Sequence, residues 1–311
     1  IDLPFPLGGC FGYWGYDLKN FIEPRLRARA MNDLELPDCA VGFYDSLAIF
    51  DHQLGKTWLV ATGLAADGSR NESRARQQAD WWHEQLTLSP TPLLPLTNGG
   101  TSPRVRLTSN FTRANFTTTI RRALDYIHAG DIYQVNLSQR FTAPWGGEGW
   151  EFYRALHAAS PAPFGAFLDA GNFQITSSSP ERFLRLSGQH IQTRPIKGTR
   201  PRDVDPQRDA QLAYELQSSE KERAELVMIT DLLRNDLGRV CEFASIAVPE
   251  LMRLEKFAQV QHLVSTVEGR LRPELSHLAA LRDCFPGGSI TGAPKFRAME
   301  IIDELEPVTR G

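Results

Sequence analysis

The sequence predicts an α+β fold in which antiparallel β-sheets form a sandwich flanked by helices. Short strand-like runs follow one another through tight turns, as at residues 182–186 and 190–194, which Ser187-Gly188-Gln189 joins into a hairpin. Apolar residues at helical spacing occur in separate blocks and do not alternate strictly with strands. This arrangement is typical of α+β proteins and disfavours a doubly wound parallel sheet.

The first 103 residues form a predicted N-terminal region that ends in a linker. They are rich in glycine and aromatic residues, with strand-like runs at 41–50 and 57–61 and a charged helix at about 67–80. Prolines and glycines crowd residues 89–103 and mark the linker. We therefore expect an N-terminal region at residues 1–103 and a second domain at residues 104–311.

The second domain has the denser pattern of structural signals. Ser219 and Glu222 form a capping box that opens one helix, and Gly238 closes it. The predicted elements are, in order, a helix at 116–127, strands over 132–194, a helix at 219–237, a strand at 259–267 and a helix at 294–305.

Composition is that of an ordinary soluble globular protein, with 41% hydrophobic and 23% charged residues. A net charge of −3 gives no electrostatic footprint for nucleic acid or an anionic membrane, so we expect neither as a partner. No apolar run approaches the roughly 20 residues of a membrane helix. The four cysteines lack metal-type spacing and are expected to be reduced thiols in the cytoplasm.

Both ends of the sequence resemble cuts. It starts at Ile1 with neither an initiator methionine nor a signal peptide, and it stops at Gly311 shortly after a helix. We therefore expect it to be part of a longer protein.

Lys197 and Glu181 are the candidate reactive pair. In an antiparallel hairpin centred near Gly188, both side chains emerge at the open end. Lysine is a nucleophile where burial or a neighbouring cation favours its free amine, and a buried glutamate can serve as a general acid. A solvated surface lysine, and an ion pair of Glu181 with Arg182 or Arg185, are the alternatives.

Glu225 is a candidate metal ligand in the most apolar part of its helix. Ile229 and Leu232 share its face, so the carboxylate is expected to point toward a core or a cavity. A buried carboxylate must be paired or bound to a cation. An ion pair with Lys221 competes with Mg²⁺, for which one carboxylate is not a complete site.

Residues 285–295 form a glycine-rich loop that enters a helix at Pro294. Backbone N–H groups at a helix start favour anions, and the loop lacks the Gly-Lys-Ser/Thr of a nucleotide triphosphate site. A carboxylate ligand is one interpretation and a plain tight turn is the other.

Two further polar features can line a cleft. Gln134, Asn136 and Ser138 share one face of a predicted strand, which could equally face water. His262 lies in the strand at 259–267, where a hydrogen-bonded structural histidine is the simpler interpretation.

Several runs appear in one order and together resemble the chorismate-binding enzymes. The resemblance covers residues 105–311 and extends more weakly to 8–17. The runs are residues 133–138, 178–183, 194–199, 231–238, 264–269 and 285–295.

Two positions indicate the branch of that family. Lys197 stands where anthranilate synthases usually carry alanine, and Gln134 stands where isochorismate and salicylate synthases usually carry lysine. The combination resembles the aminodeoxychorismate synthase branch, which forms 4-amino-4-deoxychorismate from chorismate and ammonia in p-aminobenzoate and folate synthesis.

The resemblance implies roles for individual residues of a catalytic domain at 104–311. Lys197 would attack C2 of the chorismate ring while Glu181 protonates the departing C4 hydroxyl, and ammonia would then add at C4 and expel the lysine. Mg²⁺ would be bound through Glu225. The implied substrate-binding residues are Gln134, Thr199, His262, Gly288, Ser289, Thr291 and Gly292.

The resemblance also implies partners. A separate glutamine amidotransferase subunit would supply ammonia, and tryptophan could bind in the N-terminal region. Members of the family continue past Gly311, where a substrate-binding arginine and further metal-binding glutamates are expected. The alternatives are an anthranilate synthase component I with an unusual lysine and a non-catalytic tryptophan-binding homologue.

Overall fold

The structure, a computed structural model, describes residues 5–88 and 105–310 and divides into two compact units. Among these residues, unit 1 contains 5–15 and 37–88, and unit 2 contains 16–36 and 105–310. The predicted linker at 89–103 lies outside the described residues. The sequence placed residues 16–36 in the N-terminal region, whereas the structure assigns them to unit 2.

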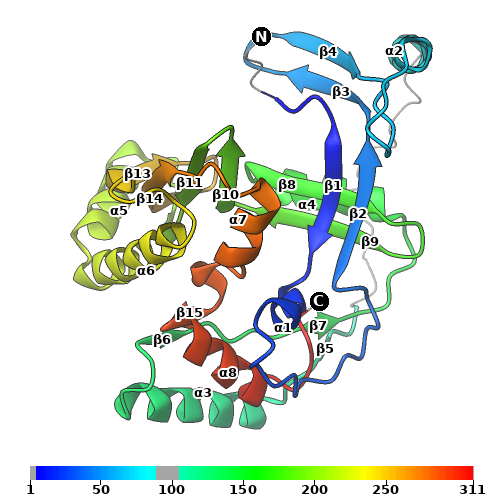
Figure 1. Ribbon diagram of the computed structural model, residues 1–311. Helices are drawn as coiled ribbons and strands as arrows, with labels where there is room; N and C mark the ends of the chain where they lie inside the picture. Colours follow the sequence, from blue (N-terminus) through cyan, green and yellow to red (C-terminus); the bar gives the residue numbers. More distant parts are fainter. Residues whose placement is uncertain (1–4, 89–104, 311) are drawn as a thin grey trace. The chain divides into compact units, whose positions relative to one another are not determined.

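Unit 1 consists of two antiparallel strand pairs and a helix (Figure 1). Its elements are β1 (Gly9–Trp14) paired with β2 (Cys39–Tyr44), β3 (Ser46–Asp51) paired with β4 (Lys56–Ala61), and α2 (Glu72–Thr87) against β3 and β4. The predicted strand at 41–50 is broken at Asp45, whose carboxylate binds Arg74 and Gln78 of α2. The helix starts later than predicted because the side chain of Asn71 caps it.

Unit 2 carries the remaining elements. In chain order these are η1 (Tyr16–Leu18), α1 (Lys19–Ile22), β5 (Thr108–Ser109), α3 (Arg113–His128), β6 (Gln134–Val135), β7 (Phe141–Thr142), α4 (Gly149–Ala159), β8 (Phe164–Asp169), β9 (Gln174–Ser179), β10 (Arg182–Ser187), β11 (His190–Arg194), β12 (Ile196–Pro201), α5 (Pro206–Ser218), α6 (Glu220–Gly238), β13 (Ala247–Lys256), β14 (Val260–Arg270), α7 (His277–Cys284), η2 (Gly288–Ile290), β15 (Gly292–Ala293) and α8 (Lys295–Leu305).

Strand β14 is the centre of an antiparallel five-stranded sheet. β11 and β12 pair with successive halves of one of its edges, and β13 pairs along the other. Helices α5 and α6 pack on β12 and β14 (Figure 1). Leu216, Leu226 and Leu263 are buried where α5, α6 and β14 meet. The predicted α+β class with antiparallel strands is confirmed.

The predicted hairpin and three predicted helices are also present. β10 and β11 pair from Arg182 opposite Arg194 to Ser187 opposite His190. Helices α3, α6 and α8 match the predicted blocks, and Ser219 Oγ accepts a hydrogen bond from the amide of Glu222. Among the described helices, none is both long enough and apolar enough to cross a membrane.

Helix α4 corrects the prediction that strands dominate residues 132–194. Its aromatic side chains pack on β8, with the ring centroids of Trp150 and Tyr153 at 5.4 and 5.9 Å from that of Phe167. Packing of these rings outweighs their local preference for strands. Elements α5, β13 and α7 have no counterpart among the predicted elements either.

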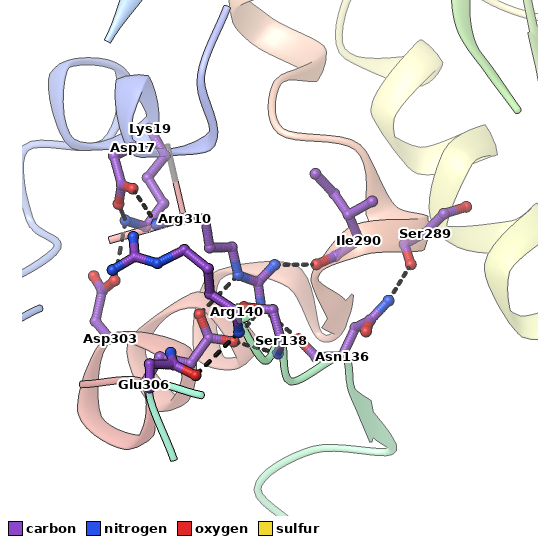
Figure 2. Close-up of polar contacts among 11 residues, drawn as sticks. Asp17, Lys19, Asn136, Ser138, Arg140, Ser289, Ile290, Asp303, Glu306 and Arg310 are labelled. Atoms are coloured by element: carbon purple, nitrogen blue, oxygen red, sulfur yellow. Dashed lines mark hydrogen bonds and ion pairs between the residues drawn. The ribbon is translucent and has the colours of Figure 1, made fainter. Parts of the chain in front are cut away.

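A buried ion cluster joins residues 16–22 to α8 within unit 2 (Figure 2). Lys19 is fully buried, and its Nζ lies 2.9 Å from Asp17 Oδ1 and 3.0 Å from Asp303 Oδ1. Burial raises the pKa of Asp303, while the charge of Lys19 opposes that shift. The cluster explains why residues 16–36 belong to unit 2.

We expect Lys19→Met to lower the free energy of unfolding by about 3–5 kcal/mol, because it leaves Asp17 and Asp303 as buried charges without their cation. Urea denaturation measures the change. Arg234→Met is the control: it removes only an exposed pair with Asp231 and should cost less than about 1 kcal/mol. Equal losses in the two variants would contradict the structural importance of the buried cluster.

Candidate active site

Glu181 lies in the short link between β9 and β10 and is partly buried. Its Oε1 accepts hydrogen bonds from Ser289 Oγ at 2.5 Å and from the amide of Ile196 at 3.4 Å. Burial raises the pKa of this carboxyl, and the two hydrogen bonds and the charge of Lys197 partly offset the rise. Glu181 therefore holds a proton more readily than an exposed glutamate, as a general acid must.

Lys197 lies within the sheet, on β12, and not beyond the end of a hairpin. Pro195 separates β11 from β12, and Lys197 pairs with Leu263 of β14. Its charge acts on Glu181, yet in the described part of the chain its ammonium forms no hydrogen bond or ion pair. The two predicted partners of a reactive pair thus interact through their charges but form no ion pair in the described structure.

The alternative ion pair of Glu181 with Arg182 or Arg185 is absent from the described residues. Arg182 instead donates to Gln192 on the neighbouring strand. The carboxylate of Glu181 is consequently free of a structural arginine partner.

A β-bulge at Gly198 shapes the strand beside Lys197. Gly198 has φ +72°, and a Cβ there would lie 2.7 Å from Leu216 Cδ1, so the position requires glycine. The bulge sets Thr199 opposite His262 of β14. Their Oγ1 and Nδ1 atoms are 2.9 Å apart.

His262 presents an unsatisfied nitrogen. The residue is 6% exposed, and its Nε2 is buried without a hydrogen-bond partner among the described residues. The carbonyl of Gly198, 3.4 Å from Nδ1, favours the proton on that nitrogen and leaves Nε2 as an acceptor. Burial lowers the pKa of His262, so the ring is neutral near pH 7. A buried unpaired acceptor of this kind suits a ligand hydroxyl or a bound water.

The glycine-rich loop between α7 and α8 folds back on itself. Thr291 is fully buried, and its hydroxyl donates to the carbonyls of Gly287 and Gly288 at 3.1 and 3.2 Å. In this structure the hydroxyl therefore shapes the loop. Its contact with a substrate carboxylate stays a prediction.

Close packing explains two of the predicted glycines. A Cβ on Gly288 would lie 2.5 Å from Leu232 Cδ2 of α6, and a Cβ on Gly292, where φ is +149°, would lie 2.1 Å from the carbonyl oxygen of Gln134. Gly292 thereby lets β15 pair with β6, where Ala293 faces Gln134. Gln134 is consequently held beside the loop.

Asn136, which the strand pattern placed on a polar face, binds the loop and does not continue the strand. Only residues 134–135 of the predicted strand pair with another strand, and Asn136 Nδ2 donates instead to the carbonyl of Ser289 at 2.9 Å (Figure 2). The bond fixes the backbone of the residue that contacts Glu181. The alternation identified Asn136 as a candidate, but it could not predict this contact, because Ser289 lies 153 positions away.

A buried ion pair holds the end of the loop. Lys295 Nζ lies 2.7 Å from Asp236 Oδ1 and also donates to the carbonyls of Cys284 and Pro286 at 3.0 and 3.1 Å. Burial raises the pKa of Asp236, and Lys295 counteracts the rise. Asp236 and Lys295 belong to two of the runs that carry the family resemblance, and here they anchor the loop to α6.

Glu225 does not point into the core. Its side chain is 33% exposed and lies 4.0 Å from Lys221 Nζ, the competing pair that the sequence allowed. Within the described ranges, no group of three histidine, cysteine, aspartate or glutamate residues could hold a metal ion. These residues therefore offer Mg²⁺ one carboxylate and do not form a complete site.

The structure brings most of the predicted residues together. The loop contributes Ser289, which binds Glu181, and Gly292, which lies on the strand that pairs with Gln134. Strand β12 carries Lys197 and Thr199, and Thr199 contacts His262 of β14. Glu225 lies on α6, which packs against β12 and η2, but among the described residues no hydrogen bond or ion pair joins it to the others. The assembled groups are an amine, a proton-retaining carboxyl and a neutral imidazole.

Known proteins with similar sequences include aminodeoxychorismate synthases and anthranilate synthases. The chain is 48% identical over 308 residues to aminodeoxychorismate synthase component 1 of Klebsiella aerogenes, covering 99% of this chain and 64% of the relative. It is 44% identical over 310 residues to anthranilate synthase component 1 of Thermus thermophilus, covering 100% and 65%. The chain thus spans just under two thirds of the length of these curated relatives.

A solved structure agrees with the fold. Anthranilate synthase component I from Streptococcus pneumoniae matches with a TM-score of 0.86 at 34% identity, over 100% of this chain and 68% of that chain. The family of chorismate binding enzymes matches residues 3–311, a range that includes every residue of the candidate site. The chain therefore belongs to the chorismate binding enzyme family.

Proposed function

We propose that this chain is the chorismate-aminating part of an aminodeoxychorismate synthase component I. The main support is the pair of Lys197 and Glu181. Lys197 forms no ion pair in the described structure, its charge acts on Glu181, and burial raises the pKa of Glu181. Relatives from Klebsiella aerogenes and Escherichia coli with that printed name are 48% and 47% identical, which supports the proposal.

The proposed chemistry has two substitutions. The free amine of Lys197 bonds to C2 of chorismate, the ring double bonds shift, and the C4–O bond breaks while Glu181 gives its proton to the departing oxygen, which leaves as water. Ammonia then bonds to C4 and the C2–N bond to Lys197 breaks. The new ammonium group at C4 returns a proton to the Glu181 carboxylate, so the product is 4-amino-4-deoxychorismate and both Lys197 and the acid form of Glu181 are regenerated.

The surrounding residues would bind and orient the substrate. We assign the Nε2 of His262, the hydroxyl of Thr199, the side chain of Gln134 and the loop at 288–292 to this role. The loop packs tightly against α6 and β6, so its backbone is a rigid surface for the ring and its carboxylates.

Mg²⁺ is a proposed cofactor, with Glu225 as one ligand. The single carboxylate fits the habit of Mg²⁺ to bind few protein groups and to complete its shell with substrate oxygens and water. We also propose that a glutamine amidotransferase subunit supplies the ammonia and that the N-terminal region binds tryptophan. The proposed location is the cytoplasm, and the proposed role is in p-aminobenzoate and folate synthesis.

The product distinguishes the proposal from its closest rival. A full-length protein that contains this chain, given chorismate, ammonium and Mg²⁺, should form 4-amino-4-deoxychorismate without pyruvate, and chelation with EDTA should abolish the reaction. The 44% identity to an anthranilate synthase keeps that activity as the second candidate. Anthranilate with an equal amount of pyruvate would overturn the proposal. Calorimetric binding of tryptophan with no binding of chorismate would favour a non-catalytic module.

Replacing the proposed nucleophile should stop the covalent route. We expect Lys197→Ala to reduce the turnover number by orders of magnitude, because no other described amine adjoins Glu181. Lys56→Ala, at an exposed strand position in unit 1, is the control and should leave turnover unchanged. Quantifying the product over time tests both. A Lys197→Ala enzyme with normal turnover would remove the covalent role.

The protonation of Glu181 should govern the alkaline limb of the pH profile. Activity is expected to fall as pH rises through the pKa of Glu181, since the acid form gives up its proton. Glu181→Gln should cost about 10²–10⁴-fold in turnover. Ser289→Ala removes a hydrogen bond that lowers the pKa of Glu181, so its alkaline limb should move to higher pH. A shift to lower pH would contradict the role assigned to Ser289.

A further inference from the structure

Arg310 lies at the centre of a largely buried polar network in unit 2 (Figure 2). Its guanidinium donates from Nη1 to the carbonyl of Ile290 at 2.7 Å and from Nη2 to the carbonyl of Asn136 at 2.5 Å. Glu306 accepts from Nε at 2.8 Å and from Nη2 at 2.6 Å. With 13% of its side chain exposed, Arg310 is not an ordinary surface arginine.

The two carbonyls belong to the segments that form the candidate site. Ile290 stands between Ser289, which donates to Glu181, and Thr291, whose carbonyl accepts from the amide of Asn136 at 2.8 Å. Asn136 follows β6, which carries Gln134. The guanidinium therefore bridges the loop and the end of β6. This bridge is additional to the hydrogen bonds that the two segments form directly with each other.

Arg310 is itself held from several sides. The carboxylate of Glu306, 3% exposed, also accepts from the amide of Ser138 at 2.6 Å. The ring of Tyr16 lies 4.4 Å from the guanidinium, and the amide of Arg310 donates to Asp17 Oδ2 at 2.9 Å. Because each of these contacts is charge-assisted or aromatic, the planar guanidinium of Arg310 has one defined orientation.

We propose that Arg310 is a positioning residue for the reaction: it locks the end of β6 to the loop, so that Ser289 stays on Glu181 and Gln134 stays beside the loop. The inference rests on the proposed function for its effect on turnover. The geometric part, from Arg310 through Ile290 and Ser289 to Glu181, is independent of which product the enzyme makes.

The rival explanation is that Arg310 only stabilises the fold. A purely structural arginine would change the free energy of unfolding and leave the environment of Glu181 as it is. A positioning arginine would also change the titration of Glu181, because Ser289 would no longer be held against it. Lys197, the other charged group that acts on Glu181 in the described structure, is retained in all the variants.

Two substitutions separate these roles. Arg310→Met removes the guanidinium and all of its hydrogen bonds. Arg310→Lys keeps a positive charge against Glu306, and with it much of the stability, but a single ammonium cannot reproduce the planar fork that bridges Ile290 and Asn136. Arg122→Met is the matched control, since it removes an arginine that pairs with Glu304 of α8 on the exposed surface of the same unit.

The carboxyl of Glu181 is observed directly by carbon-detected NMR titration, and the pH profile of turnover is measured in parallel. We expect the pKa of Glu181 to rise in Arg310→Met and Arg310→Lys, as in Ser289→Ala, with turnover at least about 10-fold lower. Arg122→Met should match the wild type. In the Ser289→Ala background, Arg310→Lys should produce no further change in the titration, because the route to Glu181 is already cut.

An unchanged Glu181 titration in folded Arg310→Lys would overturn the inference, and so would a full additional shift in the double variant. If Arg310→Met fails to fold, Arg310→Lys carries the test. If the wild type forms anthranilate instead of 4-amino-4-deoxychorismate, the proposed function fails, while the NMR titration still decides the role of Arg310.

Discussion

The hydrogen bond from Ser289 to Glu181 is the contact on which the site depends. It joins a loop and a strand link that are 108 positions apart in the chain. A single hydroxyl cannot hold that geometry, so the loop is fixed elsewhere: Lys295 ties its end to Asp236, and Gly288 packs directly on α6. Without these anchors, Glu181 would lose both its position and a hydrogen bond that tunes its pKa.

Three buried charge pairs each involve a residue of the segment 295–310: Asp236–Lys295, Lys19–Asp303 and Glu306–Arg310. Such pairs add little net stability over apolar residues, because desolvation offsets their attraction. They do define direction, since each donor must meet a particular oxygen. Asp236 and Lys295 thereby set how the loop meets α6, and Arg310 sets how the loop meets the end of β6.

Local signals in the sequence predicted the parts of the fold that depend on neighbours in the chain. The β10–β11 hairpin follows from its alternation and a Ser-Gly-Gln turn, and α6 follows from its cap at Ser219. The segments that resemble the family also identified most residues of the candidate site. What the sequence could not predict depends on distant partners: Lys197 lies in a strand because β12 pairs with β14, and Arg310 binds a carbonyl 174 positions away. The orientation expected for Glu225 was wrong because helical spacing does not show which face of the helix a neighbouring strand covers.

Burial favours the uncharged forms of Glu181 and His262. It raises the pKa of Glu181 and lowers that of His262. Chorismate carries two carboxylates, so an ionised Glu181 would repel the substrate that the proposed reaction requires. Protonation removes this repulsion and, in the same group, stores the proton that the C4 oxygen needs when it leaves. One desolvated carboxyl can therefore favour binding and catalysis together, provided that Ser289 keeps it in place.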